Sequence, residues 1–360
     1  MSLDLKNPKP FYLQIIDDIK MKISSGQLKI GEKIGSQQEL SRAYDVSLIT
    51  IKKAIAELIN QNVLFSRVGK GTYVANRPST IDLSRHKTIG VVLSDLKNPF
   101  FSLIINSIEA KASEFGYNIL LSNSADHADK EDTVIRHFLS IGVDGLIIAS
   151  LSHMYRASST IRELKNDDFP FIMVSYIEDK DVYFVGTDHE KGAYMATEHL
   201  IQAGYNQVGY ISGEEGNLLG KLREKGYLRA MKKYDKEINQ NFIFRSTSGA
   251  KDYESGYEIG ARFCRLEKRP DAIFAYKDLA ALGFEQAVLE HGMKIPQDVA
   301  IVGYDNIEST EYAPVPLTTI SQPTDEIGKL TTELLIQKIQ GNEIQFHTIL
   351  KPELIIRKSC

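Results

Sequence analysis

The chain has 360 residues, 42% of them hydrophobic and 25% charged, which is typical of a globular protein with two or three domains. No apolar run approaches the ~20 residues of a membrane span, and the N-terminus lacks the long apolar segment of an export signal. We therefore expect a cytoplasmic protein without a membrane partner. Two cysteines and eight scattered histidines argue against a disulfide framework or a metal cluster, and we expect neither a metal nor a cofactor.

The net charge of –4 is unevenly distributed along the chain. Residues 1–77 contain 12 Lys+Arg and 7 Asp+Glu, a balance of +5, so the remainder carries –9. This asymmetry predicts that the N-terminal part binds a polyanion and that the rest of the chain binds something else.

Three helices are predicted in the N-terminal part. The first begins at Pro10, where apolar residues then recur at helical spacing. The second begins at Ser36, whose S-x-x-E pattern with Glu39 satisfies free N–H groups at a helix start, and Ser47 is placed to cap the third. The outer face of the third helix carries lysines, which favours a helix-turn-helix. The alternative is an ordinary helical hairpin whose lysines are solvated.

The segment after these helices predicts a basic hairpin. Strand-forming residues 62–66 and 72–75 flank Arg67-Val-Gly-Lys-Gly71, and a tip of this kind can lie along a phosphate backbone. A phosphate-binding P-loop is excluded because its leading glycine is absent. Double-stranded DNA is therefore the expected partner. We expect the DNA contacts to come from Ser36, Gln37, Gln38, Ser47, Leu48, Ile49, Thr50, Lys52, Lys53, Gly69, Lys70, Gly71 and Thr72.

The rest of the chain alternates between strand-like and helical segments. A polar linker at 78–87 follows the N-terminal domain at 1–77, and about nine strand candidates then alternate with amphipathic helices through 88–360. Such alternation implies parallel sheets with right-handed crossovers. Nine strands are more than we expect in one sheet, so we predict an α/β fold with two lobes and a ligand bound between them.

Six motifs in the first 75 residues keep the spacing of a known family. They are Phe11-Tyr12-x-Gln14, Gly26-x-Leu28-x-x-Gly31, Ser36-x-x-Glu39-Leu40, Val46-Ser47-x-x-Thr50, Gly69-Lys70-Gly71 and Thr72-Tyr73-Val74. On these motifs the N-terminal domain resembles the winged helix-turn-helix of the GntR family of bacterial repressors.

The chain departs from the GntR pattern at Gln38, Leu48 and Lys52, where that family usually has arginines. Leu48 cannot form the bidentate pair that arginine makes with guanine, and Lys52 offers only a point charge. We therefore predict an operator rich in A·T pairs, where Leu48 and Ile49 touch thymine methyl groups. The alternative is that Leu48 is buried against the first helices.

A second series of motifs runs through residues 88–358. It includes Asn98-Pro99-Phe100-Phe101, Asp188-x-x-x-Gly192, Arg223-x-x-Gly226-Tyr227, Asp278-x-x-Ala281-x-Gly283 and Gly303-Tyr304-Asp305-Asn306. On these motifs the chain resembles the effector domain of LacI/GalR regulators, which has the two-lobed fold of periplasmic binding proteins. The resemblance implies that lobe 1 spans about 88–187 and 321–347, and lobe 2 about 188–320 and 348–360. A GntR-type head joined to a LacI-type body resembles the arabinose repressors of AraR type.

The same resemblance implies which residues contact the effector. Arg223 matches the family's arginine, whose fork can hold two hydroxyls or a carboxylate, and Asp305 is placed to accept bonds from ligand hydroxyls. The full implied set is Phe100, Phe101, Tyr176, Asp188, Arg223, Tyr253, Lys277, Asp278, Asp305 and Gln322.

Several of these residues have structural alternatives. Phe100–Phe101 could pack in the core, as could the two tyrosines, while Asp188 and Asp278 could each cap the helix that follows. Lys277 stands where the family often has asparagine. A lysine there would favour an acidic or phosphorylated effector, or would form a salt bridge with Asp278 or Asp305.

No nucleophile elbow, no cysteine with a clear histidine partner and no metal-ligand run appears, which argues against an enzyme. We predict a ligand-responsive transcriptional repressor that binds a palindromic operator as a homodimer. The expected effector is a monosaccharide such as a pentose, with a nucleobase or a sugar phosphate as alternatives. The other class is a sugar-binding protein for uptake, which the missing export signal and the winged helix disfavour.

Overall fold

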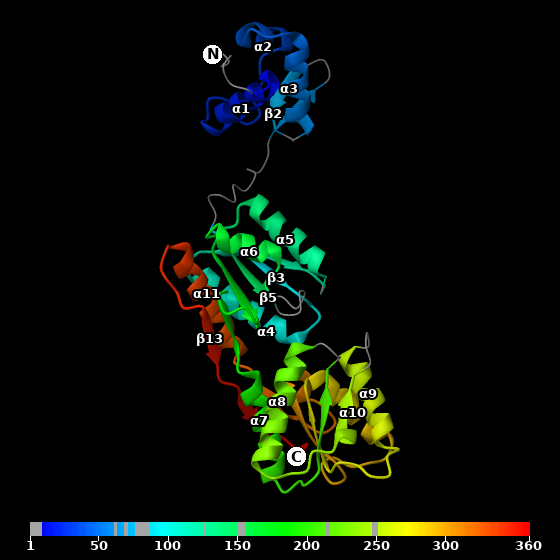
Figure 1. The fold of residues 1–360 in the computed structure, drawn as a ribbon. Helices are drawn as coiled ribbons and strands as arrows, with labels where there is room; N and C mark the ends of the chain where they lie inside the picture. The colour runs from blue at the N-terminus through cyan, green and yellow to red at the C-terminus, as the bar shows by residue number, and fades with distance from the viewer. Residues whose placement is uncertain are drawn as a thin grey trace. The chain divides into compact units, whose positions relative to one another are not determined.

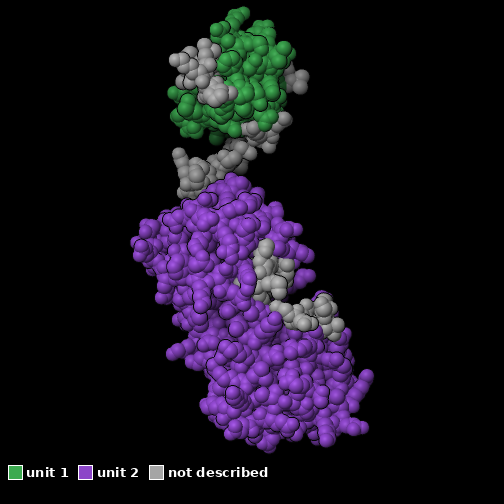
Figure 2. Space-filling model, viewed as in Figure 1, with its two compact units in different colours: residues 1–82 green, residues 83–360 purple. Residues whose placement is uncertain are grey.

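The computed structural model describes residues 9–60, 63–67, 71–75, 87–125, 127–149, 156–213, 217–246 and 251–360. The chain forms two compact units, Met1–Asp82 and Leu83–Cys360, coloured green and purple in Figure 2. The division between them falls within the linker expected at 78–87. Each unit is described by itself.

In its described residues, the first unit contains three helices and a two-stranded antiparallel hairpin. Its elements are α1 (Phe11–Ser24), α2 (Gln37–Tyr44), α3 (Leu48–Asn60), β1 (Leu64–Arg67) and β2 (Gly71–Val74). The start of α2 is a capping box, in which Ser36 Oγ accepts from Glu39 N and the Glu39 carboxylate accepts from Ser36 N. The turn before α3 is possible because Asp45 adopts a left-handed conformation, with φ of 52°.

One apolar core holds this unit together. It is built from one face of α1 and one face of α3, with Ile15, Ile19, Ile51 and Leu58 almost completely buried. These residues recur at helical spacing, so the pattern that predicts the helices also forms the core.

The second unit contains two six-stranded sheets flanked by helices (Figure 1). The sheet of lobe 1 has the strand order β13-β7-β6-β5-β3-β4 and is parallel throughout. Its strands are β3 (Thr88–Leu93), β4 (Asn118–Asn123), β5 (Gly145–Ala149), β6 (Phe171–Ser175), β7 (Phe184–Thr187) and β13 (His347–Leu350). Its helices are α4 (Pro99–Glu114), α5 (Ala128–Ile141), α6 (Ser159–Asn166) and α11 (Thr324–Ile339).

The sheet of lobe 2 has the order β14-β12-β11-β10-β8-β9 and is parallel except for β14, which pairs antiparallel with β12. Its strands are β8 (Val208–Ser212), β9 (Ile243–Arg245), β10 (Ala272–Ala275), β11 (Ala300–Asp305), β12 (Thr318–Ser321) and β14 (Glu353–Ile355). Its helices are α7 (His189–Gln202), α8 (Leu218–Lys233), η2 (Gln240–Phe242), α9 (Asp252–Phe263), α10 (Asp278–Glu290) and η3 (Glu308–Thr310).

Within the described residues the chain passes between the lobes three times. It leaves lobe 1 after β7, returns after β12 because α11 packs on α4 and β5, and leaves again between β13 and β14. The last passage lies beyond the boundary expected at residue 347, because β13 pairs with β7 as far as Leu350.

Glycines allow the helices of lobe 2 to pack closely on one another. A side chain at Gly283 of α10 would overlap the carbonyl oxygen of Tyr253, and one at Gly256 of α9 would overlap that of Ala280. In the corresponding helix pair of lobe 1 the overlaps are smaller, since a Cβ at Gly328 of α11 would lie 2.6 Å from the Cβ of Ser107 and 2.8 Å from the carbonyl oxygen of Ile104. Close packing in lobe 2 therefore depends on the absence of side chains at these positions.

Candidate functional site

The first candidate site is the start of α3 in the first unit. Ser47 precedes the helix, and its Oγ accepts from Thr50 N at 3.3 Å and lies 2.9 Å from Thr50 Oγ1. Leu48 and Ile49 are 43% and 78% exposed. The alternative in which Leu48 is buried against the first helices is therefore wrong. Two large apolar side chains in solvent at a helix start are available to contact another molecule.

The cationic residues of α3 differ in their surroundings. Lys52 and Lys53 are both exposed, but the Lys53 ammonium lies 3.9 Å from the ring centroid of Tyr12 on α1. Lys53 is therefore held against α1 by a cation–π contact.

The other residues predicted to contact DNA lie at the start of α2 and in the hairpin. Ser36, Gln37, Gln38 and Gly71 are exposed, and Thr72 is half-buried. Gly69 and Lys70 lie outside the described residues.

The second candidate site is a buried polar network in lobe 2, centred on Arg223 of α8. Its guanidinium donates to the carbonyl oxygen of Tyr276 and, from Nη2, to Asp305 Oδ1 at 3.3 Å. It also stacks on the ring of Tyr304, with Cζ 3.7 Å from the ring centroid. The side chain is only 1% exposed, so these partners, and not water, must stabilise its positive charge.

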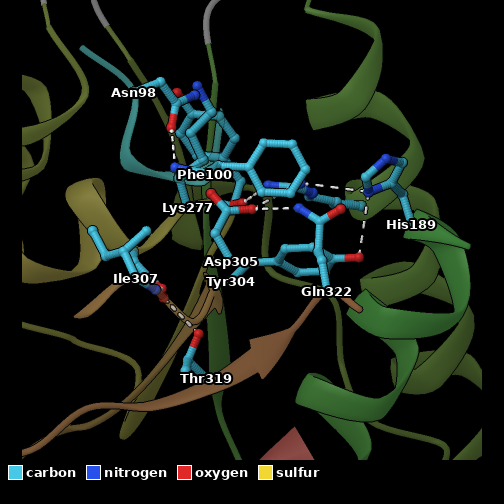
Figure 3. Close-up of polar contacts among 12 residues, drawn as sticks. Asn98, Phe100, His189, Lys277, Tyr304, Asp305, Ile307, Thr319 and Gln322 are labelled. Carbon is cyan, nitrogen blue, oxygen red and sulfur yellow. Dashed lines mark hydrogen bonds and ion pairs between the residues drawn. The ribbon is translucent and has the colours of Figure 1, made fainter. Parts of the chain in front are cut away.

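Asp305 lies at the carboxyl end of β11, where the backbone is strained. Its φ is 118° and that of Asn306 is 55°, both in the region that favours glycine. Its Oδ1 also accepts from Gln322 Nε2 at 2.8 Å, which joins β11 to the segment after β12 (Figure 3). Burial raises the pKa of Asp305, while the positive charges of Arg223 and Lys277 oppose that rise. Arg223, Asp305 and Gln322 are therefore brought together as a bonded group.

Asp278 is completely buried beneath this group and does not cap α10. The residue before the helix is Lys277, whose side chain makes no capping bond. The Asp278 carboxylate instead accepts from Thr319 Oγ1 at 2.5 Å and from Ile307 N at 2.9 Å. Burial, with the nearby charge of Asp305, raises the pKa of Asp278 to about 7. Asp278 thus ties α10 to β12 and to the turn after β11.

Lys277 forms an ion pair with an acid that the sequence did not single out. Its Nζ donates to Asp252 Oδ2 at 2.9 Å, so the expected salt bridge to Asp278 or Asp305 is wrong. Asp252 also accepts from the hydroxyl of Tyr276. The residue that joins the network at the start of α9 is therefore Asp252, whereas its neighbour Tyr253 is 41% exposed.

His189 is a second residue that sequence reasoning missed. Its Nδ1 lies 3.4 Å from Arg223 Nη2 and 3.3 Å from the hydroxyl of Tyr304. Because arginine only donates, Nδ1 is the acceptor in its contact with Arg223. The ring of Tyr176 meets His189 edge-on from lobe 1, with centroids 6.3 Å apart. Tyr176 also lines a hollow of about 370 Å³ with Arg156, Arg162, Glu178 and Asp179.

The remaining predicted residues have structural contacts. Asp188 caps α7, since its side chain accepts from Lys191 N at 2.9 Å. Phe100 and Phe101 begin α4, are 5% and 2% exposed, and belong to the core of lobe 1. The ring of Phe100 nevertheless points toward Asp305 and Gln322 (Figure 3).

The described residues contain neither a membrane-spanning helix nor a metal-binding cluster. None of their helices is long and apolar enough to cross a membrane. Over the same ranges, no three His, Cys, Asp or Glu side chains are grouped so that they could hold a metal ion.

Two family models match the chain. The model described as periplasmic binding proteins and sugar binding domain of LacI family matches residues 86–357. The model described as bacterial regulatory proteins, gntR family, matches residues 11–74.

Similar proteins fall into the same classes. An arabinose metabolism transcriptional repressor of Halalkalibacterium halodurans is 29% identical over 97% of this chain and 96% of its own length. An HTH-type transcriptional repressor, PurR, of Vibrio parahaemolyticus is 31% identical over 76% of this chain and 81% of its own. The crystal structure of a LacI family transcriptional regulator from Enterococcus faecium with bound ribose is 30% identical, with a TM-score of 0.66 over 76% of this chain and 98% of that one.

Proposed function

We infer that this chain, which belongs to the family of periplasmic binding proteins and sugar-binding domains of LacI type and carries a gntR-family domain, is a transcriptional repressor switched by a small molecule. The observation that carries this conclusion is the bonded group of Arg223, Asp305 and Gln322 at the ends of β11 and β12. Ligands of open α/β sheets bind at the carboxyl ends of strands, which is where this group lies.

The proposed effector is a monosaccharide. Arg223 offers a planar fork of donors, and Asp305 and Gln322 offer acceptors, which is the mixture that vicinal hydroxyls require. The relatives named for arabinose metabolism and the ribose-bound structure support an effector of the size of a monosaccharide. Phe100 and Tyr176 would supply the apolar surface against which a sugar ring packs.

The proposed mechanism is allosteric coupling between effector binding and operator binding in a cytoplasmic homodimer. Two winged domains bind the halves of a palindromic operator, and a sugar between the lobes biases the dimer toward one DNA-binding geometry. The coupling free energy is typically ~1–3 kcal/mol, and it acts equally in both directions.

The proposed operator is rich in A·T pairs. Leu48 and Ile49 are exposed at the start of α3, where they would meet thymine methyl groups in the major groove. Selection of binding sequences from a random pool tests this. We expect A·T pairs beneath both copies of α3, and fixed G·C pairs there would contradict the proposal.

The variant Arg223→Ala tests the assignment of the effector site. We expect this variant to bind the operator and to lose its response to the effector, with at least ~100-fold weaker sugar binding, because a buried cation that holds Asp305 is removed. Fluorescence anisotropy with operator DNA, with and without sugar, measures both properties. The matched control is Arg229→Ala on the same helix, which removes an exposed ion pair with Glu190. A normal response from Arg223→Ala would overturn the assignment.

A further inference from the structure

We propose that the ion pair between Asp252 and Lys277 makes the effector site selective for uncharged polyhydroxyl ligands, and that Asp252 is the residue that sets this selectivity. The inference rests on the proposed function, since it concerns the same effector site. It adds the charge class of the ligand and a residue that neither the sequence motifs nor the comparisons assign.

The pair lies where two helices of lobe 2 begin. Asp252 is the first residue of α9, and Lys277 directly precedes α10. Their charged atoms are 2.9 Å apart, and the two side chains are 20% and 25% exposed for Lys277 and Asp252, respectively. Each keeps some contact with solvent, so a ligand can reach them, yet both are sufficiently enclosed for the charges to act strongly on each other.

The pair is connected to the Arg223 group through Tyr276. Arg223 donates to the carbonyl oxygen of Tyr276, while the hydroxyl of the same residue donates to Asp252. Burial by itself would raise the pKa of Asp252, but Lys277, the Tyr276 hydroxyl and Arg223 together lower it below its ordinary value. Asp252 is therefore ionised at neutral pH and lies within the field of both cations.

The charges of this network are already balanced before a ligand arrives. Lys277 is paired with Asp252 and Arg223 with Asp305, so among the described residues of the network each cation has its own carboxylate. Asp278, whose carboxyl interacts electrostatically with that of Asp305, adds further negative charge whenever it ionises. A phosphate or carboxylate on the ligand would face these acids without an uncommitted cation to receive it.

An uncharged sugar meets no such penalty. Its hydroxyls both donate and accept, so they can bond to the carboxylates of Asp252 and Asp305 and to the cations of Lys277 and Arg223 without separating either pair. Replacing Asp252 by asparagine keeps the shape of the side chain but leaves Lys277 without its counter-charge. The site then gains a cation that suits an anionic sugar.

An alternative role for the pair is to hold α9 against α10. These helices already pack closely through Gly256 and Gly283. A purely structural pair would change stability when it is broken, and it would weaken all ligands by the same factor. A selectivity role changes the ratio between charged and uncharged ligands.

The test compares matched sugars by isothermal titration calorimetry with the full chain. The probes are ribose with ribose 5-phosphate, arabinose with arabinose 5-phosphate, and glucose with glucose 6-phosphate and glucuronate. For wild type we expect the uncharged member of a pair to bind at least ~10-fold more tightly than its charged counterpart. For Asp252→Asn we expect the ratio to move at least ~10-fold toward the charged member, and Asp252→Asn/Lys277→Asn should return it toward the wild-type value.

The matched control is Glu254→Gln. This acid lies in the same first turn of α9 and pairs with Lys251 on the surface, so its removal should leave the ratio unchanged. A wild-type protein that binds a charged probe as tightly as its uncharged counterpart overturns the inference, whether or not the variants fold. An unchanged ratio in Asp252→Asn also overturns it. If no probe binds the wild-type protein, the proposed sugar-responsive function fails, and the inference fails with it.

Discussion

The two lobes of the second unit share a strand order but differ in what they place near the ends of their strands. Lobe 1 contributes aromatic side chains, Phe100 and Tyr176, whereas lobe 2 buries the charged residues Arg223, Asp278 and Asp305. In lobe 2 these charges already bond to one another and to neighbouring strands. One scaffold can therefore supply an apolar surface from one lobe and a fixed polar group from the other.

The difference extends to helix packing. Lobe 2 brings α9 against α10 through Gly256 and Gly283, and this closeness places Asp252 at the start of α9 beside Lys277 at the start of α10. Lobe 1 has a looser helix pair, α4 and α11, and no buried arginine among its described residues. The positions of the charged side chains of Asp252 and Lys277 thus depend on how closely the backbones of α9 and α10 approach each other.

The largest expected effect concerns this packing. Gly283→Ala should destabilise the protein by about 3 kcal/mol, because the new methyl group overlaps the backbone of α9 and the helices must separate. Gly328→Ala in lobe 1 should cost less, about 2 kcal/mol, since its overlaps with the Ser107 Cβ at 2.6 Å and the Ile104 carbonyl oxygen at 2.8 Å are smaller. Urea unfolding measures both. Equal losses would show that the lobes are packed equally tightly.

The second prediction concerns the buried acid Glu285 of lobe 2. Its Oε1 accepts from Val315 N at 2.9 Å, while its Oε2 has no hydrogen-bond partner among the described residues. Burial raises the pKa of Glu285 to about 7 in the folded protein, from an ordinary value of 4.5. As pH rises, Glu285 loses its proton in the unfolded chain before it does so in the folded protein. Its contribution to the free energy of unfolding therefore falls between about pH 4.5 and 7 and is constant above pH 7.

Glu285→Gln removes this loss and should stabilise the protein by about 3 kcal/mol at pH 8, with little gain at pH 4.5. Urea unfolding across this pH range measures the difference. The control is Glu290→Gln on the same helix. Hydrogen bonds from Tyr257 and Gln286 lower the pKa of Glu290, so its replacement should not stabilise at any pH. A gain for Glu285→Gln that is independent of pH would contradict the assigned cause.

The smallest expected effect concerns the aromatic side chain of Phe100 in lobe 1. Phe100→Leu should weaken sugar binding about 10-fold, or ~1.4 kcal/mol, because a flat ring that points toward Asp305 and Gln322 is replaced by a branched chain. Phe138→Leu removes a buried ring from a different core cluster of lobe 1 and should leave affinity unchanged. Titration calorimetry compares the two variants. Identical affinities would remove Phe100 from the proposed site.

Much of this fold follows from patterns in the sequence. The nine predicted strands of the second unit are all present. Seven of them are runs of mostly apolar residues buried in a sheet, whereas the edge strands β4 and β9 are partly exposed. The strands β12, β13 and β14 were not predicted. The first is rich in threonine, and the other two are short, half-exposed edge strands whose residues show neither an apolar run nor clear alternation.

Residues of the candidate site could be predicted only where the sequence resembles that of a known family. The resemblance placed Arg223, Asp305 and Gln322 in one predicted effector site, and in the structure Arg223 and Gln322 both bond to Asp305. Asp252 and His189 carry no such signal. Asp252 looks like an ordinary acidic residue at a helix start, and its role arises only because α10 brings Lys277 within 2.9 Å.

The two strands between residues 347 and 355 have a consequence for synthesis. β13 covers the edge of β7 in one lobe, and β14 covers the edge of β12 in the other. A ribosome that has translated only as far as residue 346 therefore carries two sheets with unpaired backbone edges, which are sites for aggregation. The first unit, which precedes Leu83, can fold before the second unit has been synthesised.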